Sequence, residues 1–127
     1  MKAILDTHAF LWALSGDARM SRHARDIFAG PADLSLSMAS FWEIIIKVQS
    51  RKLNFPRPAG PYVLSKLAEN RIECLPVTID HLLALEGLPM HHRDPFDRIL
   101  IAQSLEENLP IVTSDPWFSQ YPVEVIW

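Results

Sequence analysis

The sequence predicts an α/β fold in three layers, α/β/α, with a central, mostly parallel sheet of about five short strands. Short apolar runs typical of buried strands alternate along the chain with longer segments of helical periodicity. The composition is 49% hydrophobic over 127 residues, which is enough to fill a core. Acidic residues stand at the ends of two of the predicted strands, where α/β proteins hold their ligands. We expect a single domain spanning residues 1–127.

The first half of the chain is divided by clear start and stop signals. Gly16 ends the first helix, and Ser21 is suited to be the N-cap of the second. Polar and apolar residues alternate over Asp33–Ser37, which predicts a strand. Three prolines and a glycine predict a loop over residues 54–61. The predicted strands are 1–5 and 33–37, and the predicted helices are 9–14, 21–29, 40–51 and 62–70.

The second half begins with a strand and ends with two. Gly87 closes a short helix, and Pro95 fits the first position of the last long helix. The final strands are apolar and bounded by turn residues. The predicted strands are 72–77, 110–113 and 123–127, and the predicted helices are 80–86 and 95–107.

Four acidic residues are expected to converge although they are far apart in the sequence. Asp6 and Asp115 each follow a predicted strand, and the carboxyl ends of parallel strands meet at one edge of a sheet. Asp97 falls in the first turn of a predicted helix. Glu43 lies among large apolar residues, and a partly buried carboxylate needs a counter-charge. The sequence therefore predicts a site for a hard divalent cation.

Such a site suits the hydrolysis of phosphodiester bonds. Mg²⁺ and Mn²⁺ prefer carboxylate and water oxygens, and they activate water and stabilise phosphoryl oxygens. Basic side chains near the acids, Lys47, Arg93 and Arg98, are candidates to hold flanking phosphates. Thr7 and Ser114 are candidates to orient a carboxylate or a water molecule.

Each of these positions also has a purely structural interpretation. Asp6 would cap the helix that follows it, and Glu43 would form an ion pair with Lys47 four residues later. Asp94, with Pro95 after it, fits the N-cap of the last helix, and capping is the favoured interpretation there. The residues alone leave both interpretations open at the other positions.

Other classes of protein are disfavoured by composition. The formal net charge is −3, so the chain has no strong basic signal for nucleic acid. If four acids bound metal, however, the remainder would be slightly positive and compatible with a polyanion. Cys74 is the only cysteine, which suits a reducing, cytoplasmic setting. The amino terminus is a poor signal peptide, and we expect no membrane segment.

Other catalytic motifs are missing. The adjacent histidines His91 and His92, taken with Cys74, lack the spacing of zinc ligands. There is no P-loop, no GxSxG and no GxGxxG. The role of the two histidines stays open at this point.

Four segments, in their order along the chain, resemble motifs of the PIN-domain family, and within it of the VapC-type toxin ribonucleases of toxin–antitoxin systems. The segments are residues 1–8 (MKAILDTH), 40–47 (SFWEIIIK), 92–103 (HRDPFDRILIAQ) and 111–115 (IVTSD). The resemblance implies that Asp6, Glu43 and Asp97 are core metal ligands and that Asp115 is the fourth acid. Asp94 and Lys47 are implied as secondary site residues.

The resemblance also implies an activity and partners. It points to a metal-dependent endoribonuclease that cleaves RNA and acts as the toxin of its pair. It implies a homodimer that is neutralised by a cognate antitoxin, whose tail lies across the active-site groove. Two alternatives remain: a housekeeping PIN-type nuclease for RNA processing, and a non-catalytic interaction module.

Overall fold

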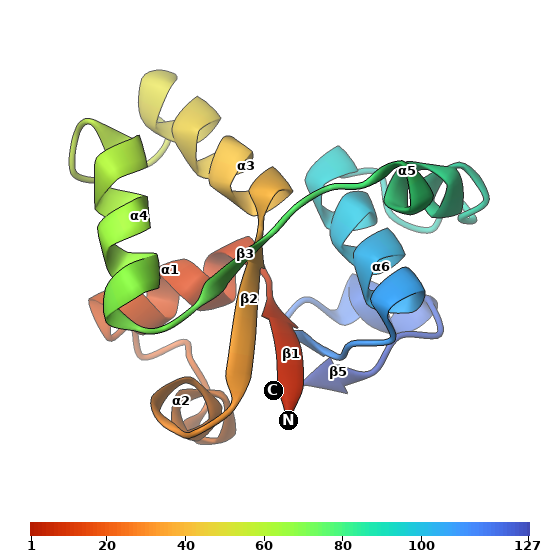
Figure 1. Cartoon of the computed structure of the whole chain (residues 1–127), viewed down its shortest axis with the longest axis horizontal. Helices are drawn as coiled ribbons and strands as arrows, with labels where there is room; N and C mark the ends of the chain where they lie inside the picture. Colours follow the sequence, from red (N-terminus) through yellow and green to blue (C-terminus); the bar gives the residue numbers. More distant parts are fainter.

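A five-stranded sheet forms the centre of the protein, and all neighbouring strands in it are parallel. The computed structural model describes all residues from Met1 to Trp127 (Figure 1). The strands are β1 (Lys2–Leu5), β2 (Asp33–Ser37), β3 (Glu73–Leu75), β4 (Ile111–Val112) and β5 (Val125–Ile126). Their order is β3-β2-β1-β4-β5. The predicted parallel α/β fold is confirmed.

Six helices and one short 3₁₀ helix surround this sheet. They are α1 (Thr7–Ser15), α2 (Arg22–Ala29), α3 (Met38–Gln49), α4 (Ala59–Glu69), α5 (Ile79–Glu86), α6 (Pro95–Glu107) and η1 (Pro116–Gln120). Figure 1 shows α1 and α4 on one side of the sheet and α5 and α6 on the other. None of these helices combines the length and the apolar character needed to cross a membrane.

Two apolar cores lie on opposite faces of the sheet. Successive side chains of a strand point to opposite faces, so Ala3 and Leu5 join the core beneath α1, α3 and α4. Ile4 points the other way and packs with Leu100 and Phe118 from α6 and η1. The side chains of Ala3, Ile4 and Leu5 are fully buried, as expected for the central strand of a sheet covered on both faces.

The strand order places a topological switch point beside β1. The chain proceeds from β1 to β2 to β3 in one direction and then returns to place β4 on the other side of β1. Leu5 of β1 is paired with Val112 of β4. In open α/β sheets, ligands bind in the crevice at the carboxyl ends of the strands where the order reverses. The residues after Leu5 and Val112 therefore lie where this kind of sheet binds its ligands.

Several helix boundaries differ from the prediction for reasons visible in the caps. α3 begins at Met38 rather than residue 40, because the Ser37 hydroxyl at the end of β2 accepts the Ala39 N–H at 3.0 Å. α4 begins at Ala59 rather than residue 62, because proline is tolerated in the first turn of a helix. The bounds predicted for α6 and β2 are confirmed.

The last three strands are shorter than predicted. The predicted ranges 72–77, 110–113 and 123–127 reduce to three, two and two paired residues. Pro76 and Pro110 bound β3 and β4, and proline has no N–H for a strand ladder. After β4 the chain turns into η1, which was expected only as a turn. Asp115 caps η1 and Pro116 opens it, the same pattern that opens α6.

Candidate active site

Asp6 and Thr113 link the carboxyl ends of the two central strands. Asp6 follows β1 and is buried, with 4% of its surface exposed. Its Oδ1 accepts the Ala9 N–H at 2.6 Å and so caps α1. Its Oδ2 accepts a short hydrogen bond from the Thr113 hydroxyl, which follows β4. The carboxylate is thus held across the switch point by one bond from a helix and one from a strand end.

Glu43 is held in a similar way by two donors from different elements. Thr7 Oγ1 on α1 donates to Glu43 Oε1 at 2.7 Å. Lys47 Nζ lies 2.7 Å from Glu43 Oε2, which is the predicted ion pair at i+4. The pair is not a solvated surface contact, because the Glu43 side chain is only 6% exposed while that of Lys47 is 35% exposed. Lys47 is therefore partly exposed to solvent while it pairs with a buried carboxylate.

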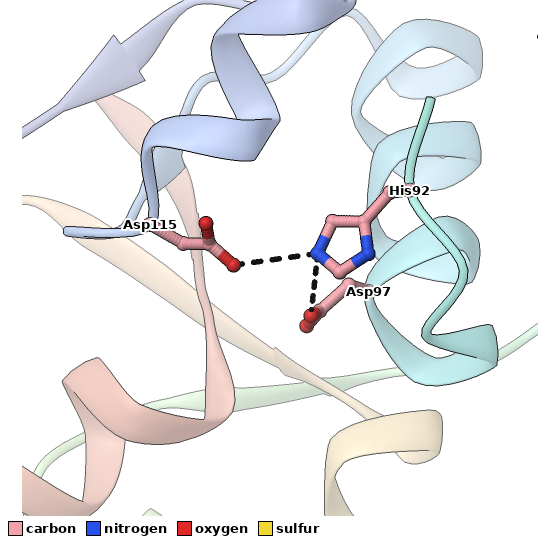
Figure 2. Close-up of side chains that lie close together, drawn as sticks. All are labelled: His92, Asp97 and Asp115. Atoms are coloured by element: carbon pink, nitrogen blue, oxygen red, sulfur yellow. Dashed lines mark hydrogen bonds and ion pairs between the residues drawn. The ribbon is translucent and has the colours of Figure 1, made fainter. Parts of the chain in front are cut away.

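Asp97 and Asp115 both approach one nitrogen of the His92 ring, as Figure 2 shows. His92 Nε2 lies 3.1 Å from Asp97 Oδ2 and 3.3 Å from Asp115 Oδ2. The other oxygen of Asp115, Oδ1, accepts the Trp117 N–H at the start of η1. One atom of each of these three side chains lies within 4.8 Å of the others, close enough to share one ion.

The electrostatics of Asp97 indicate that the acids face one another. Burial, the largest cause, and the neighbouring carboxylates together raise the pKa of Asp97 to about 8; in decreasing order of effect, the carboxylates are Asp94, Glu43, Asp6 and Asp115. Burial also raises the pKa of Asp6, against the lowering effect of its bonds from Thr113 and Ala9. Carboxylates from distant parts of the sequence thus lie close enough to oppose one another's ionisation.

This donor set fits a hard divalent cation. Carboxylate oxygens are the ligands that Mg²⁺ and Mn²⁺ prefer, and a cation lowers the cost of holding several carboxylates together. Asp6 and Asp115 use one oxygen for a helix cap and direct the other toward the site. The capping and ligand interpretations of these acids are therefore compatible.

The supporting residues expected from the sequence divide into two groups. Thr7 and Lys47 contact a site carboxylate. Ser114 is exposed, and the neighbouring Thr113 instead supplies the hydroxyl that orients Asp6. Asp94 Oδ1 accepts the N–H groups of Phe96 and Asp97 at 2.9 and 3.1 Å, so it caps α6 as the sequence favoured.

Arg98 does not take the position expected of a phosphate-binding residue. Its Nη1 donates to the Pro89 carbonyl at 2.9 Å and to the Tyr121 hydroxyl at 3.2 Å. Its Nη2 reaches the carbonyls of Leu85 and Leu88. A guanidinium with five donors can satisfy several unpaired carbonyls at once. We therefore correct the expectation: Arg98 orders the chain between α5 and α6.

His92 is the site residue that sequence reasoning left without a role. The histidine pair was judged only against zinc spacing, which it does not meet. The sequence feature that could have indicated a role is its position two residues before Asp94, the N-cap of α6. A side chain placed there lies next to the first turn of the helix that carries Asp97. His91, by contrast, is exposed and its ring lies against Tyr121.

The fold and the site define an α/β protein with an acidic centre at the switch point of a parallel sheet. The sequence matches the family model of the PIN domain over residues 3–124. The chain therefore belongs to the PIN-domain family, whose members are nucleases. A comparison with curated proteins finds no match.

Solved structures share the fold over nearly the full chain. VapBC2 from Rickettsia felis, bound to promoter DNA, gives a TM-score of 0.71 at 16% identity and covers 100% of this chain and 99% of that chain. FitAcB from Neisseria gonorrhoeae gives 0.69 at 17% identity, with 100% and 97% covered. A toxin–antitoxin complex from Klebsiella pneumoniae gives 0.67 at 17% identity, with 98% and 96% covered. At these identities the likeness establishes the shared fold.

Proposed function

We propose that this protein is a Mg²⁺- or Mn²⁺-dependent endoribonuclease and the toxin of a toxin–antitoxin pair. The observation that carries the proposal is the convergence of Asp6, Glu43, Asp97 and Asp115 at the switch point of a PIN fold. Residues 1–127 act as one domain in this proposal, and its setting is the cytoplasm. The alternative of a non-catalytic module gives no reason for burying several carboxylates beside one another.

The four acids are the residues that would hold the cation. A divalent cation bound there supplies a Lewis acid that makes water a better nucleophile and offsets charge on the phosphate. The chain's own contribution is to fix the oxygens in advance. Thr113 orients Asp6, and Thr7 and Lys47 orient Glu43. Lys47, partly exposed, also presents a positive charge to a polyanionic substrate at the edge of the site.

The antitoxin is the partner favoured by the structural neighbours. One of the neighbours described above, from Klebsiella pneumoniae, is a toxin–antitoxin complex by its own description. A cavity of about 500 Å³ opens between α1 and the segment that leads from α3 to α4, and Lys47 lines it next to the site. Leu11, Trp12 and Phe55 give it apolar walls. An antitoxin segment lying there would pass beside Glu43 and block access to the acids.

A second copy of the chain is the further partner that we propose. Ile79 and Leu83 on α5 are 75% and 63% exposed, and Met90 beyond α5 is 71% exposed. Large apolar side chains grouped on one helix are a common feature of surfaces that pair. Sedimentation of the free protein would show a homodimer if this surface is covered by a second copy.

The test of the proposed function is RNA cleavage by matched acid variants. Asp6→Asn and Asp97→Asn keep the size of the side chain and remove its charge. Loss of a metal ligand should reduce cleavage by about a hundredfold or more and abolish growth arrest on induction. Asp33→Asn, an exposed acid at the start of β2, is the control and should behave as wild type. Mapping RNA ends after induction identifies the target.

Two results would contradict the proposal. Wild-type cleavage by both site variants would rule out catalysis by these acids. Efficient cleavage of RNA with no effect on growth would instead favour a housekeeping nuclease over a toxin.

A further inference from the structure

His92 is fixed on every side by groups that belong to neighbouring elements. Its main-chain N–H donates to the Tyr121 hydroxyl at 2.9 Å, and its carbonyl accepts from Arg98 Nη1 at 3.5 Å. Its ring meets the Phe118 ring edge-on, with centroids 6.0 Å apart and planes at 85°. The side chain is only 13% exposed. Its direction toward the acids is therefore imposed by the surrounding structure.

The hydrogen bonds determine which ring nitrogen carries the proton. Nδ1 lies 3.2 Å from the Asp94 main-chain nitrogen, which can only donate, so Nδ1 must accept. The proton of the neutral ring is then on Nε2, and we assign it there from these partners. Nε2–H donates to Asp115 Oδ2 at 3.3 Å, and Asp97 Oδ2 lies 3.1 Å from the same nitrogen. A protonated Nδ1 would place two donors against each other.

An N–H group in this position presents a partial positive charge to the carboxylates, as a metal cation would, and offers no lone pair to coordinate a metal. It donates to Asp115 and lies 3.1 Å from an oxygen of Asp97, so it sits between the two carboxyl groups as a bound ion would. It cannot coordinate a metal, because the nitrogen lone pair needed for coordination is absent while the proton is there. A cation that binds Oδ2 of both Asp97 and Asp115 must therefore replace the Nε2–H group between them.

We propose that His92 holds Asp97 and Asp115 together in the metal-free protein and competes with the divalent cation for them. The inference builds on the proposed metal-dependent function and adds a residue that controls occupancy of its site. His92 is a positioning residue in this scheme. It preserves the spacing of the two carboxyl groups, and a cation that binds between them must displace its N–H.

Mg²⁺ titration of full-length variants by calorimetry tests this directly. His92→Ala removes a charge-assisted hydrogen bond that binding has to break, so we expect Mg²⁺ to bind about tenfold more tightly. His92→Gln retains an N–H donor of similar reach and should bind close to wild type. His91→Ala, in the neighbouring exposed position, is the matched control and should not change the affinity. Thermal unfolding of each variant verifies that it is folded.

The direction of the change decides between competition and coordination. Weaker Mg²⁺ binding by His92→Ala, with His91→Ala unchanged, would overturn the proposal, and so would unchanged binding. Tighter binding by His92→Ala but not by His92→Gln would support it, because a general loosening of the loop would affect both.

Nitrogen NMR of histidine-labelled protein gives a second readout that does not depend on activity. In the metal-free protein, Nε2 of His92 should carry the proton. On saturation with Mg²⁺ it should keep that proton but lose its carboxylate partners, which changes the Nε2–H shifts. Loss of the Nε2 proton on Mg²⁺ binding would identify coordination and overturn the proposal.

Failure of this inference can be separated from failure of the proposed function. If wild type binds Mg²⁺ and cleaves RNA while His92→Ala leaves the affinity unchanged, only the role of His92 is wrong. If Mg²⁺ binds to no variant and RNA is not cleaved, the metal site itself is absent and both proposals are wrong.

Discussion

Asp97 is the carboxyl group whose ionisation this fold opposes most clearly. An ordinary aspartate has a pKa near 3.8, whereas burial and four nearby carboxylates raise that of Asp97 to about 8. At neutral pH the metal-free protein therefore keeps a proton on Asp97. A cation that takes this oxygen has to displace the proton, so acid conditions weaken metal binding.

This raised pKa predicts that the metal-free protein loses stability as the pH rises from about 4 to about 8. Between those values the unfolded chain has released the Asp97 proton while the folded chain still holds it. Because the folded state binds more protons there, the free energy of unfolding falls with rising pH. Asp97→Asn removes this contribution and should flatten the profile. Urea unfolding in EDTA at pH 5 and pH 8 measures it.

The control for the pH prediction is the exposed acid at the start of β2. Asp33→Asn should reproduce the wild-type dependence, because Asp33 lies in solvent. An equal pH dependence in wild type and Asp97→Asn would show that Asp97 ionises normally in the folded protein.

Sequence reasoning identified the acids but not the side chains that orient them. Thr113 and Ser114 are adjacent hydroxyl residues after β4; the sequence suggested Ser114 for the site, and Thr113 is the one that contacts Asp6. Side chains alternate in direction along an extended chain, so a one-residue change in register decides which hydroxyl meets Asp6. The role of His92 stayed open and Arg98 was expected at a phosphate. Both contact Tyr121 at the end of η1, an element that the pattern did not predict.

At the level of elements, helix starts deliver the acids to the site. Asp6 caps α1, Asp94 caps α6 and Asp115 caps η1. A cap needs one carboxylate oxygen, which leaves the second oxygen of Asp6 and of Asp115 for other partners. Partly positive helix starts also reduce the cost of placing these charges near one another.

Asp94 differs from the other two, and the difference gives a second prediction. Its Oδ1 alone accepts both N–H groups at the start of α6, which makes capping its main contribution. Asp94→Ala should destabilise the protein by about 1 kcal/mol, while Asp94→Asn should be nearly neutral because asparagine caps as well. Urea unfolding and Mg²⁺ calorimetry on both variants measure the effect. Loss of Mg²⁺ binding in a stable Asp94→Asn protein would make Asp94 a ligand instead.

The bounds of helices and strands were predicted most accurately where capping residues or clean alternation mark them in the sequence. The α6 bounds were correct because Asp94 and Pro95 define its start, and a strand that alternates cleanly, β2, was also correct. α3 was placed two residues late because its cap, Ser37, is also the last residue of a strand. The same Asp–Pro signal opens η1, but five residues of 3₁₀ helix are too few to show periodicity.

At the level of the whole molecule, the sheet brings together what the sequence separates. The fold class could be predicted because strands and helices alternate. The strand order could not, because nothing local specifies that β4 returns to pair with β1. That pairing is what places Asp6 beside Thr113, and it depends on burial of Ile4 and Ile111 in the core shared with α6.

A bound cation should stabilise this whole arrangement, which gives a third prediction. Mg²⁺ at a hundred times its dissociation constant should raise the free energy of unfolding of the wild-type protein by about 2.7 kcal/mol. Asp97→Ala should show little increase, because it removes an oxygen of the site. Thermal unfolding with and without Mg²⁺ measures this, with NaCl at matched ionic strength as control. Equal stabilisation of both proteins would place the binding elsewhere.

The bond between Thr113 and Asp6 joins residues 107 positions apart, and this has a consequence for the protein while it is being made. Asp6 emerges from the ribosome long before Thr113, which completes the setting of its carboxylate. A nascent chain cannot assemble the cluster before then. For an enzyme proposed to attack its own cell's RNA, the order of synthesis alone delays activity until the segment that carries Thr113 has emerged from the ribosome.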